Sequence, residues 1–262
     1  MIVRASPLGS GPNASEWLLI PQQEHARLSH TLASAWGNDR VPPLICPRDE
    51  PGHPLAAVRD EFLQAMLHHD DGWAEWWQAP GVDPETARPY AFTDMPPADA
   101  QRLWSASIDH CRAIGPLAGW VVASHFSQLQ SKQDDDYDQW RDWLARVDHR
   151  RSGWLEEWLA ASRDHTENLA GRCLAWLQAF DWLSLWLCCK CPHAHEPPAD
   201  PGPLELGPQG HLPKVTFTPH NQAIKVGPWP FAESELALSV KAKQLSSGNQ
   251  ELAWKLNAER GN

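Results

Sequence analysis

Four segments of the sequence place a histidine or an aspartate on the apolar face of a helix. In each of them apolar residues recur at the alternating three-and-four spacing of one buried helical stripe. The segments are 21–36, 55–70, 116–129 and 174–188, and their polar members are His25, His69, Asp70, His125 and Asp181. Burying an isolated charge costs far more than ordinary packing returns. A fold for this chain must therefore provide partners for all of these groups.

The simplest shared partner is a cation. Imidazoles and carboxylates turned inward from separate helices compensate one another most directly when they converge on one metal ion. We therefore expect a divalent ion, without distinguishing Mn, Fe, Co, Mg, Ni or Zn. The expected ligands are His25, His69, Asp70 and Asp181. The alternative is a buried polar network without metal, in which the histidines are ordinary core residues and the helix end at Asp70 is solvated.

The composition excludes some classes of partner. The chain has 262 residues and a net charge of -11, without a run rich in lysine or arginine, which argues against nucleic-acid binding. Residues 1–11 lack the apolar core of a signal peptide, and no segment has the length of a membrane span. We therefore expect a cytoplasmic protein without membrane contact. Sixteen tryptophans, many at helical spacing, indicate core packing or a ligand-stacking wall.

A cluster of soft metal ligands follows the last helical segment. Its members are Cys188, Cys189, Cys191, His193 and His195. The cysteines do not form an evenly spaced disulfide framework, which favours a reducing compartment. The ligands are crowded without the loop that separates ligand pairs in structural zinc sites, so we favour free cysteines at a buried helix end over a second metal site. The acidic run 134–136 is interpreted as a solvated helix start rather than a magnesium site.

The remaining patterns predict a mostly α fold with a small sheet (α+β). We expect a single domain, 1–262, in which the N- and C-terminal segments form the sheet. Its parts are N-terminal strands at 1–20, a helical metal-binding body at 21–191, a Pro/Gly-rich connector at 192–213, and C-terminal strands with a terminal helix at 214–262. The expected strands are 1–4, 17–20, 215–218, 223–226 and 236–240, and the further helices are 98–114, 116–131, 137–161 and 163–189.

Several short sequences spread over most of the chain resemble the bacterial family known as domain of unknown function 3891. They are Met1-Ile2-Val3-Arg4, Trp17-Leu18-Leu19-Ile20, Gln23-Glu24-His25-Ala26, Trp36-Gly37, His69-Asp70-Asp71-Gly72-Trp73, Arg88-Pro89-Tyr90 with Phe92, Ser124-His125, Asp181-Trp182-Leu183-Ser184-Leu185 and Pro228-Trp229-Pro230-Phe231. The family name itself implies no activity.

The order His, His-Asp, His, Asp also resembles the HD-domain superfamily of helical metal-dependent phosphohydrolases. That resemblance implies an HD-domain-like helical bundle in which the first His, the His-Asp pair and the last Asp bind one metal. The matching positions here are His25, His69, Asp70 and Asp181. Members with two metals add two histidines before the last Asp. His125 fits one of these, and the other could be His110, His149 or His165, so we expect one ion and leave a second open.

These expectations lead to a hypothesis about function. A divalent ion in such a site would support hydrolysis of a phosphate ester or a nucleotide-like, anionic small molecule. We expect His125 to act as a general acid or phosphate contact and Asp71 to orient a ligand. The expected substrate-binding or positioning residues are Gln23, Trp73, Trp76 and Arg88. The alternatives are an iron-dependent oxygenase on the same scaffold and a non-enzymatic binding or interaction protein.

Overall fold

The structure, a computed structural model, describes residues 1–5, 17–50, 52–85, 88–131, 137–192, 201–220, 223–244 and 248–259. The acidic run 134–136 and the histidines at 193 and 195 lie outside the described residues.

The helices follow the apolar stripes of the sequence closely. The helix expected from residue 163 begins instead at Glu167, where the Thr166 hydroxyl accepts a hydrogen bond from the Leu169 amide as an N-cap. A short 3-10 turn, η1, interrupts the chain directly after the His69-Asp70 pair. The elements are α1 (Gln22–Ala35), α2 (Ala56–His68), η1 (Asp71–Trp73), α3 (Ala74–Gln78), α4 (Pro97–Ile114), α5 (Pro116–Ser131), α6 (Tyr137–Ala161) and α7 (Glu167–Lys190).

The strands form one seven-stranded mixed sheet. Its order is β1-β2-β6-β7-β5-β4-β3, with β5 parallel to β7 and all other neighbours antiparallel. The sheet therefore joins both ends of the chain through the pairing of β2 with β6. The strands are β1 (Ile2–Ala5), β2 (Trp17–Ile20), β3 (Leu204–Leu206), β4 (Val215–His220), β5 (Ala223–Gly227), β6 (Glu235–Gln244) and β7 (Gly248–Ala258).

This sheet contradicts the expected mostly α, HD-domain-like bundle with a small sheet. About half of the structure is helical, and the sheet is a full structural layer. The expected terminal helix is instead β7, the longest strand. Its sequence contains helix-forming Glu, Leu, Ala and Lys, but Leu252, Trp254 and Leu256 alternate with exposed residues and are buried, which is the two-residue period of a strand. The connector also contains β3, which was not expected.

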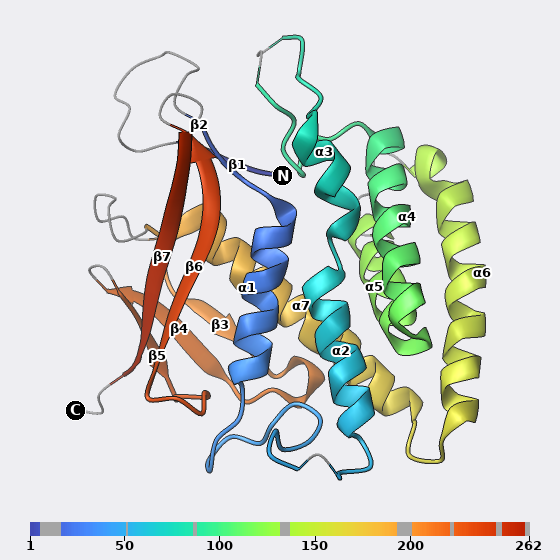
Figure 1. Cartoon of the computed structure of the whole chain (residues 1–262), viewed down its shortest axis with the longest axis vertical. Helices are drawn as coiled ribbons and strands as arrows, with labels where there is room; N and C mark the ends of the chain where they lie inside the picture. The colour runs from blue at the N-terminus through green and yellow to red at the C-terminus, as the bar shows by residue number, and fades with distance from the viewer. Residues whose placement is uncertain are drawn as a thin grey trace.

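The helices and the sheet pack as layers. Figure 1 shows the sheet on one side, α1 and α7 next to it, and α2, α4, α5 and α6 beyond them. A continuous apolar core runs through these layers. It includes Leu28 of α1, Phe62 of α2, Val121 of α5, Phe180 of α7, Val240 of β6 and Leu256 of β7. Among the described residues, no helix combines the length and apolar character that crossing a bilayer requires.

Helix α1 is fastened to the sheet by side chains that flank His25. The Glu24 carboxylate accepts a hydrogen bond from the Lys241 amide of β6 at 2.7 Å. Arg27 donates to the Ser239 carbonyl of the same strand at 2.6 Å. These contacts fix α1 on the sheet, so His25, between them in sequence, is directed toward the other helices.

Gly72 allows η1 to lie directly against α4. A Cβ atom at this position would stand 2.0 Å from the Leu103 carbonyl oxygen and 2.8 Å from the Ser107 amide nitrogen, both backbone atoms that cannot move independently. The Gly72 amide also donates to the Ser107 hydroxyl at 3.0 Å. The close approach holds the segment after α2 in place.

We expect Gly72→Ala to lower the free energy of unfolding by about 1–3 kcal/mol, because the new methyl group would be packed against backbone atoms and would force α4 or η1 to shift. Urea denaturation of the metal-free protein measures this. The matched control is Gly153→Ala on α6, where a new Cβ meets no atom within 4 Å and helix propensity should add up to about 1 kcal/mol. Equal stabilities for the two variants would contradict the packing argument.

Candidate metal centre

The four ligand-bearing helical segments meet at one place. His25 comes from α1, His69 and Asp70 follow the end of α2, His125 comes from α5 and Asp181 from α7. All five side chains are buried. One ligand atom each of His25, His69 and Asp181 lie within 4.8 Å of one another, so this group could hold a metal ion. The expected convergence of the inward-facing residues is therefore present.

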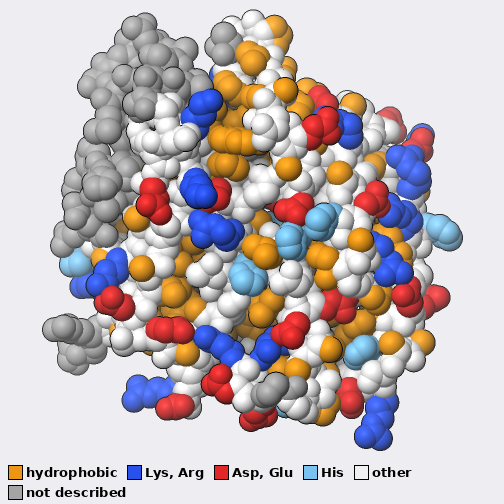
Figure 2. Space-filling model, in the orientation of Figure 1, with side chains coloured by type: hydrophobic (Ala, Val, Ile, Leu, Met, Phe, Trp, Pro, Cys, Tyr) orange, Lys and Arg blue, Asp and Glu red, His pale blue; other side chains and the backbone are white. Residues whose placement is uncertain are grey.

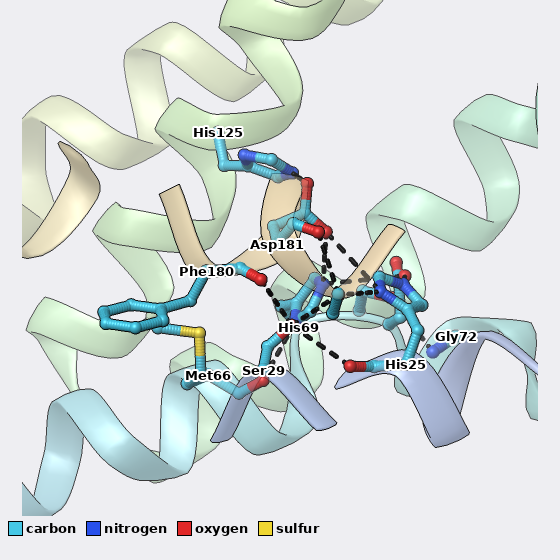
Figure 3. Close-up of polar contacts among 11 residues, drawn as sticks. His25, Ser29, Met66, His69, Gly72, His125, Phe180 and Asp181 are labelled. Carbon is cyan, nitrogen blue, oxygen red and sulfur yellow. Dashed lines mark hydrogen bonds and ion pairs between the residues drawn. The ribbon is translucent and has the colours of Figure 1, made fainter. Parts of the chain in front are cut away.

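Short distances join the four expected ligands, and Figure 3 shows His25, His69 and Asp181 directed toward one another. His69 Nε2 lies 3.4 Å from Asp181 Oδ1 and 3.6 Å from Asp70 Oδ2. His25 Nε2 lies 2.6 Å from Asp70 Oδ2, and its Nδ1 lies 3.7 Å from Asp181 Oδ1. The separations of 3.4 Å and 3.6 Å are those expected of ligands bound to one ion at about 2.0–2.2 Å. The 2.6 Å contact between His25 and Asp70 is that of a hydrogen bond, and Asp70 lies outside the group of three residues that could hold an ion.

His69 is oriented as metal-binding histidines commonly are. Its Nδ1–H donates to the Met66 carbonyl at 2.8 Å, which leaves the lone pair of Nε2 directed into the cluster. Nε2 is buried and has no hydrogen-bond partner among the described residues. A buried acceptor without a donor is costly, and a cation between His69 and the two carboxylates would satisfy it.

A serine fixes the tautomer of His25. The Ser184 hydroxyl donates to the Asp181 carbonyl at 2.8 Å, so it accepts from His25 Nδ1, 3.0 Å away. In a neutral imidazole the Nε2 of His25 then carries a lone pair that faces Asp70 Oδ2. Two acceptors at 2.6 Å require a proton between them, and a metal ion bound by both would have to displace this proton and separate the two atoms.

In the absence of metal, the pKa values of His69 and Asp181 are shifted so that positive charge is retained beside the carboxylates. Burial by itself would lower the pKa of His69, but the carboxylates of Asp70 and Asp181 outweigh it and raise the pKa to about 9. Burial would raise the pKa of Asp181, but His69, whose Nε2 lies 3.4 Å from its carboxylate, and the neighbouring imidazoles lower it to about 2. Protons are therefore bound in the cluster when no metal is present. A metal ion has to compete with these protons for the same imidazole nitrogens and carboxylate oxygens.

His125 lies at the edge of the cluster and differs from the other histidines. Its Nε2 is 3.8 Å from Asp181 Oδ2, and its buried Nδ1 has no hydrogen-bond partner among the described residues. Burial lowers the pKa of His125 to about 4, although the Asp181 charge opposes this. The ring is therefore neutral near pH 7. This suits a metal ligand, a proton acceptor or a hydrogen-bond donor better than a protonated general acid.

A pocket of about 790 Å³ opens beside the cluster. Its volume lies within the range of small-molecule sites, roughly 300–1,000 Å³. The wall combines the ligands His25, Asp70 and Asp181 with His125, and most of the remaining wall is apolar or aromatic. The aromatic members are Trp73, Phe92, Trp104, Phe126, Trp182 and Trp186. The cluster is thus reached from a cavity large enough for a substrate.

The structure places the other expected site residues in different environments. Trp73 and Trp76 pack in one small core cluster with Leu103, and of the two only Trp73 also lines the pocket. Arg88 pairs with Asp94 and lies over the Trp17 ring. The remaining two, Gln23 and Asp71, do not line the pocket either.

Two residues next to the cluster differ from the expectation. Gln22, not Gln23, lines the pocket, and its buried Oε1 has no hydrogen-bond partner among the described residues. Asp71 points away and contacts His68 and His110 instead of a ligand. The sequence carries a signal for Gln22, because this residue lies three positions before His25 and therefore on the same buried face of α1.

The cysteine-rich end of α7 serves the packing of this helix. Arg4 donates to the carbonyl oxygens of Cys188 and Cys191 and so caps the C-terminus of α7. Burial raises the pKa of the Cys189 thiol to about 11, and those of Cys188 and Cys191 are raised further. Neither group of potential metal ligands found among the described residues includes these cysteines.

Comparison with known proteins assigns the chain to a family. The model of the family described as "Protein of unknown function (DUF3891)" matches residues 1–247. The chain belongs to this family, which confirms the first resemblance. The resemblance to the HD-domain superfamily receives no support from the comparisons. No curated protein and no solved structure shows significant similarity to the chain.

We expect metal uptake at the cluster to release protons and to weaken as the pH falls. His69, with a pKa near 9, carries a proton at pH 7 that a metal must displace. Each displaced proton lowers the apparent affinity about tenfold per pH unit below that pKa. Zinc titrations in weak buffer between about pH 6 and pH 8 measure both effects.

The matched pair for this experiment is His69→Asn and His149→Asn, the second on the exposed face of α6. The first should abolish the tightest uptake together with its proton release, and the second should keep both. An affinity independent of pH would contradict the competition between proton and metal.

Proposed function

We propose that the chain is a metal-dependent hydrolase of a small phosphate ester. The observation that supports this most is the buried group of His25, His69 and Asp181, with Asp70 beside it, next to a pocket large enough for a substrate. A divalent ion in such a site lowers the pKa of a bound water and neutralises charge on a phosphoryl group. Two imidazoles and two carboxylates also leave coordination positions open for these ligands.

The residues around the cluster have distinct roles in this proposal. Ser184 holds the tautomer of His25, and the Met66 carbonyl holds that of His69, so both rings present a fixed nitrogen. His125, neutral because of its burial, accepts a proton from the attacking water or donates a hydrogen bond to a phosphoryl oxygen.

The pocket wall favours a substrate with a flat, apolar body. Trp104 and Phe126, stacked on each other, line the pocket, and Trp182 is 58% exposed beside Asp181, so the wall includes an open aromatic surface. Lys190 is the only lysine or arginine among the described residues that line the pocket. A single anionic group next to the cluster, on an aromatic alcohol or a nucleoside, fits this distribution better than a polyphosphate.

The test is hydrolysis by untagged protein, stripped with chelator and reloaded with manganese, cobalt, iron or magnesium. Aryl phosphates, aryl phosphodiesters and nucleoside monophosphates form the substrate panel. We expect activity only after reloading, and Asp181→Asn should lower kcat by at least about 10²-fold, since a metal ion contributes several kcal/mol of transition-state stabilisation.

The control for Asp181→Asn is Asp164→Asn, the same change at an exposed residue between α6 and α7, which should retain activity. Circular dichroism verifies that both variants are folded. Absence of hydrolysis with every metal and every ester in the wild-type protein would refute the proposal.

One observation favours a second candidate, an iron-dependent oxygenase. His25, His69 and Asp181 together are two histidines and one carboxylate, the ligand set of many non-haem iron(II) oxygenases. Oxygen consumption by the iron(II)-loaded protein, with no ester hydrolysis under anaerobic conditions, would replace the hydrolase proposal with this one.

A further inference from the structure

A second group of metal-binding side chains lies on the outer side of the same turn. His68 Nδ1 is 2.7 Å from Asp71 Oδ2, and His110 Nε2 of α4 is 3.4 Å from the same oxygen. The rings of His68 and His110 stack with their centroids 5.0 Å apart. One ligand atom from each of the three residues lies within 4.8 Å of the others.

The three side chains are open to solvent, unlike the buried cluster. His68 is 28%, Asp71 26% and His110 49% exposed at the side chain. Figure 2 shows histidines beside acidic side chains in the middle of this face of the molecule. A metal ion can therefore reach them directly, without entering the pocket.

The geometry points to a second metal site here: we propose that His68, Asp71 and His110 bind a divalent transition-metal ion at the surface. Two imidazole nitrogens and one carboxylate oxygen suit zinc, cobalt, nickel or copper rather than magnesium or calcium, which prefer oxygen ligands. The remaining coordination positions face water. This site is separate from the one that supports the proposed hydrolysis.

The backbone holds these ligands in place before any ion binds. His68 is the last residue of α2 and Asp71 the first of η1, so both belong to one tight turn. The contact of Gly72 with α4, including its hydrogen bond to Ser107, brings this turn against the helix. His110 lies one helical turn beyond Ser107 and so faces Asp71.

The arrangement of the donor atoms also suits a cation. Both imidazoles direct a nitrogen at a single carboxylate oxygen. An ion bound by all three side chains would accept a lone pair from each ring and place its positive charge against the Asp71 carboxylate. His30 of α1 lies near His68, and burial, followed by the charge of His68, lowers the pKa of His30.

The two sites share one stretch of backbone. In the run from His68 to Asp71, the outer residues turn to the surface group and the inner pair, His69 and Asp70, turns to the buried cluster. An ion at the surface would tie α4 to the turn and restrict the backbone that carries two buried ligands. Its binding should therefore stabilise the turn and strengthen metal retention at the buried cluster.

The test counts cobalt(II) equivalents bound by the untagged full chain after chelator treatment, with visible absorption to report the ligand type. His110→Asn and His68→Asn should each bind one equivalent fewer than the wild type. The matched control is His149→Asn, at an exposed position of α6. It should bind as many cobalt equivalents as the wild type. Two variants on different elements guard against a folding defect in one of them.

Further outcomes separate this site from the buried one. Asp181→Asn should lose a different equivalent, so that Asp181→Asn combined with His110→Asn loses two. Retention of the wild-type stoichiometry in both His68→Asn and His110→Asn would overturn the proposal, and so would an intense thiolate charge-transfer band for the equivalent that they remove. Neither readout depends on catalytic activity, so a failure of the proposed hydrolysis would leave this result unaffected.

Discussion

The compensation of two buried carboxylates is the constraint on which the rest of the structure depends. Asp70 and Asp181 lie in the interior between helices, where an unpaired charge would be prohibitively costly. The protein supplies His25 and His69 within 4 Å of them, from α1 and the end of α2. Helices α1, α2 and α7 must therefore meet with their polar residues in register. The apolar core of these helices extends around the cluster and fixes that register.

The position of the cluster could be predicted from the sequence because its signal is local. The apolar stripe around a histidine indicates that its side chain faces the core. Four helices with such stripes must pack with these faces together, which brings their polar residues close to one another. Hence His25, His69, Asp70 and Asp181 were identified without knowledge of the tertiary fold. The long helices were predicted for the same reason, with the largest boundary error at the start of α7, whereas the short η1 and α3 were not predicted.

The sheet was underestimated because its determinants are not local. β7 consists largely of residues with high helix propensity, and its strand conformation depends on pairing with β6 over ten residue positions. β3 is only three residues long and is held by β4. The pocket wall was missed for a related reason. Nothing in the sequence near Trp104 indicates that α4 brings it to the cluster, whereas Trp182 could have been found from its position next to Asp181.

Helix α1 is attached to β6, a strand that is synthesised much later than α1 itself. His25 is held in place through Glu24 and Arg27 by a strand that follows every ligand of the cluster in the chain. Closing so long a loop is slow and entropically unfavourable until the last strands are available. The ribosome must therefore deliver β6 before His25 is anchored. A metal ion could therefore meet the assembled cluster only after β6 has been synthesised.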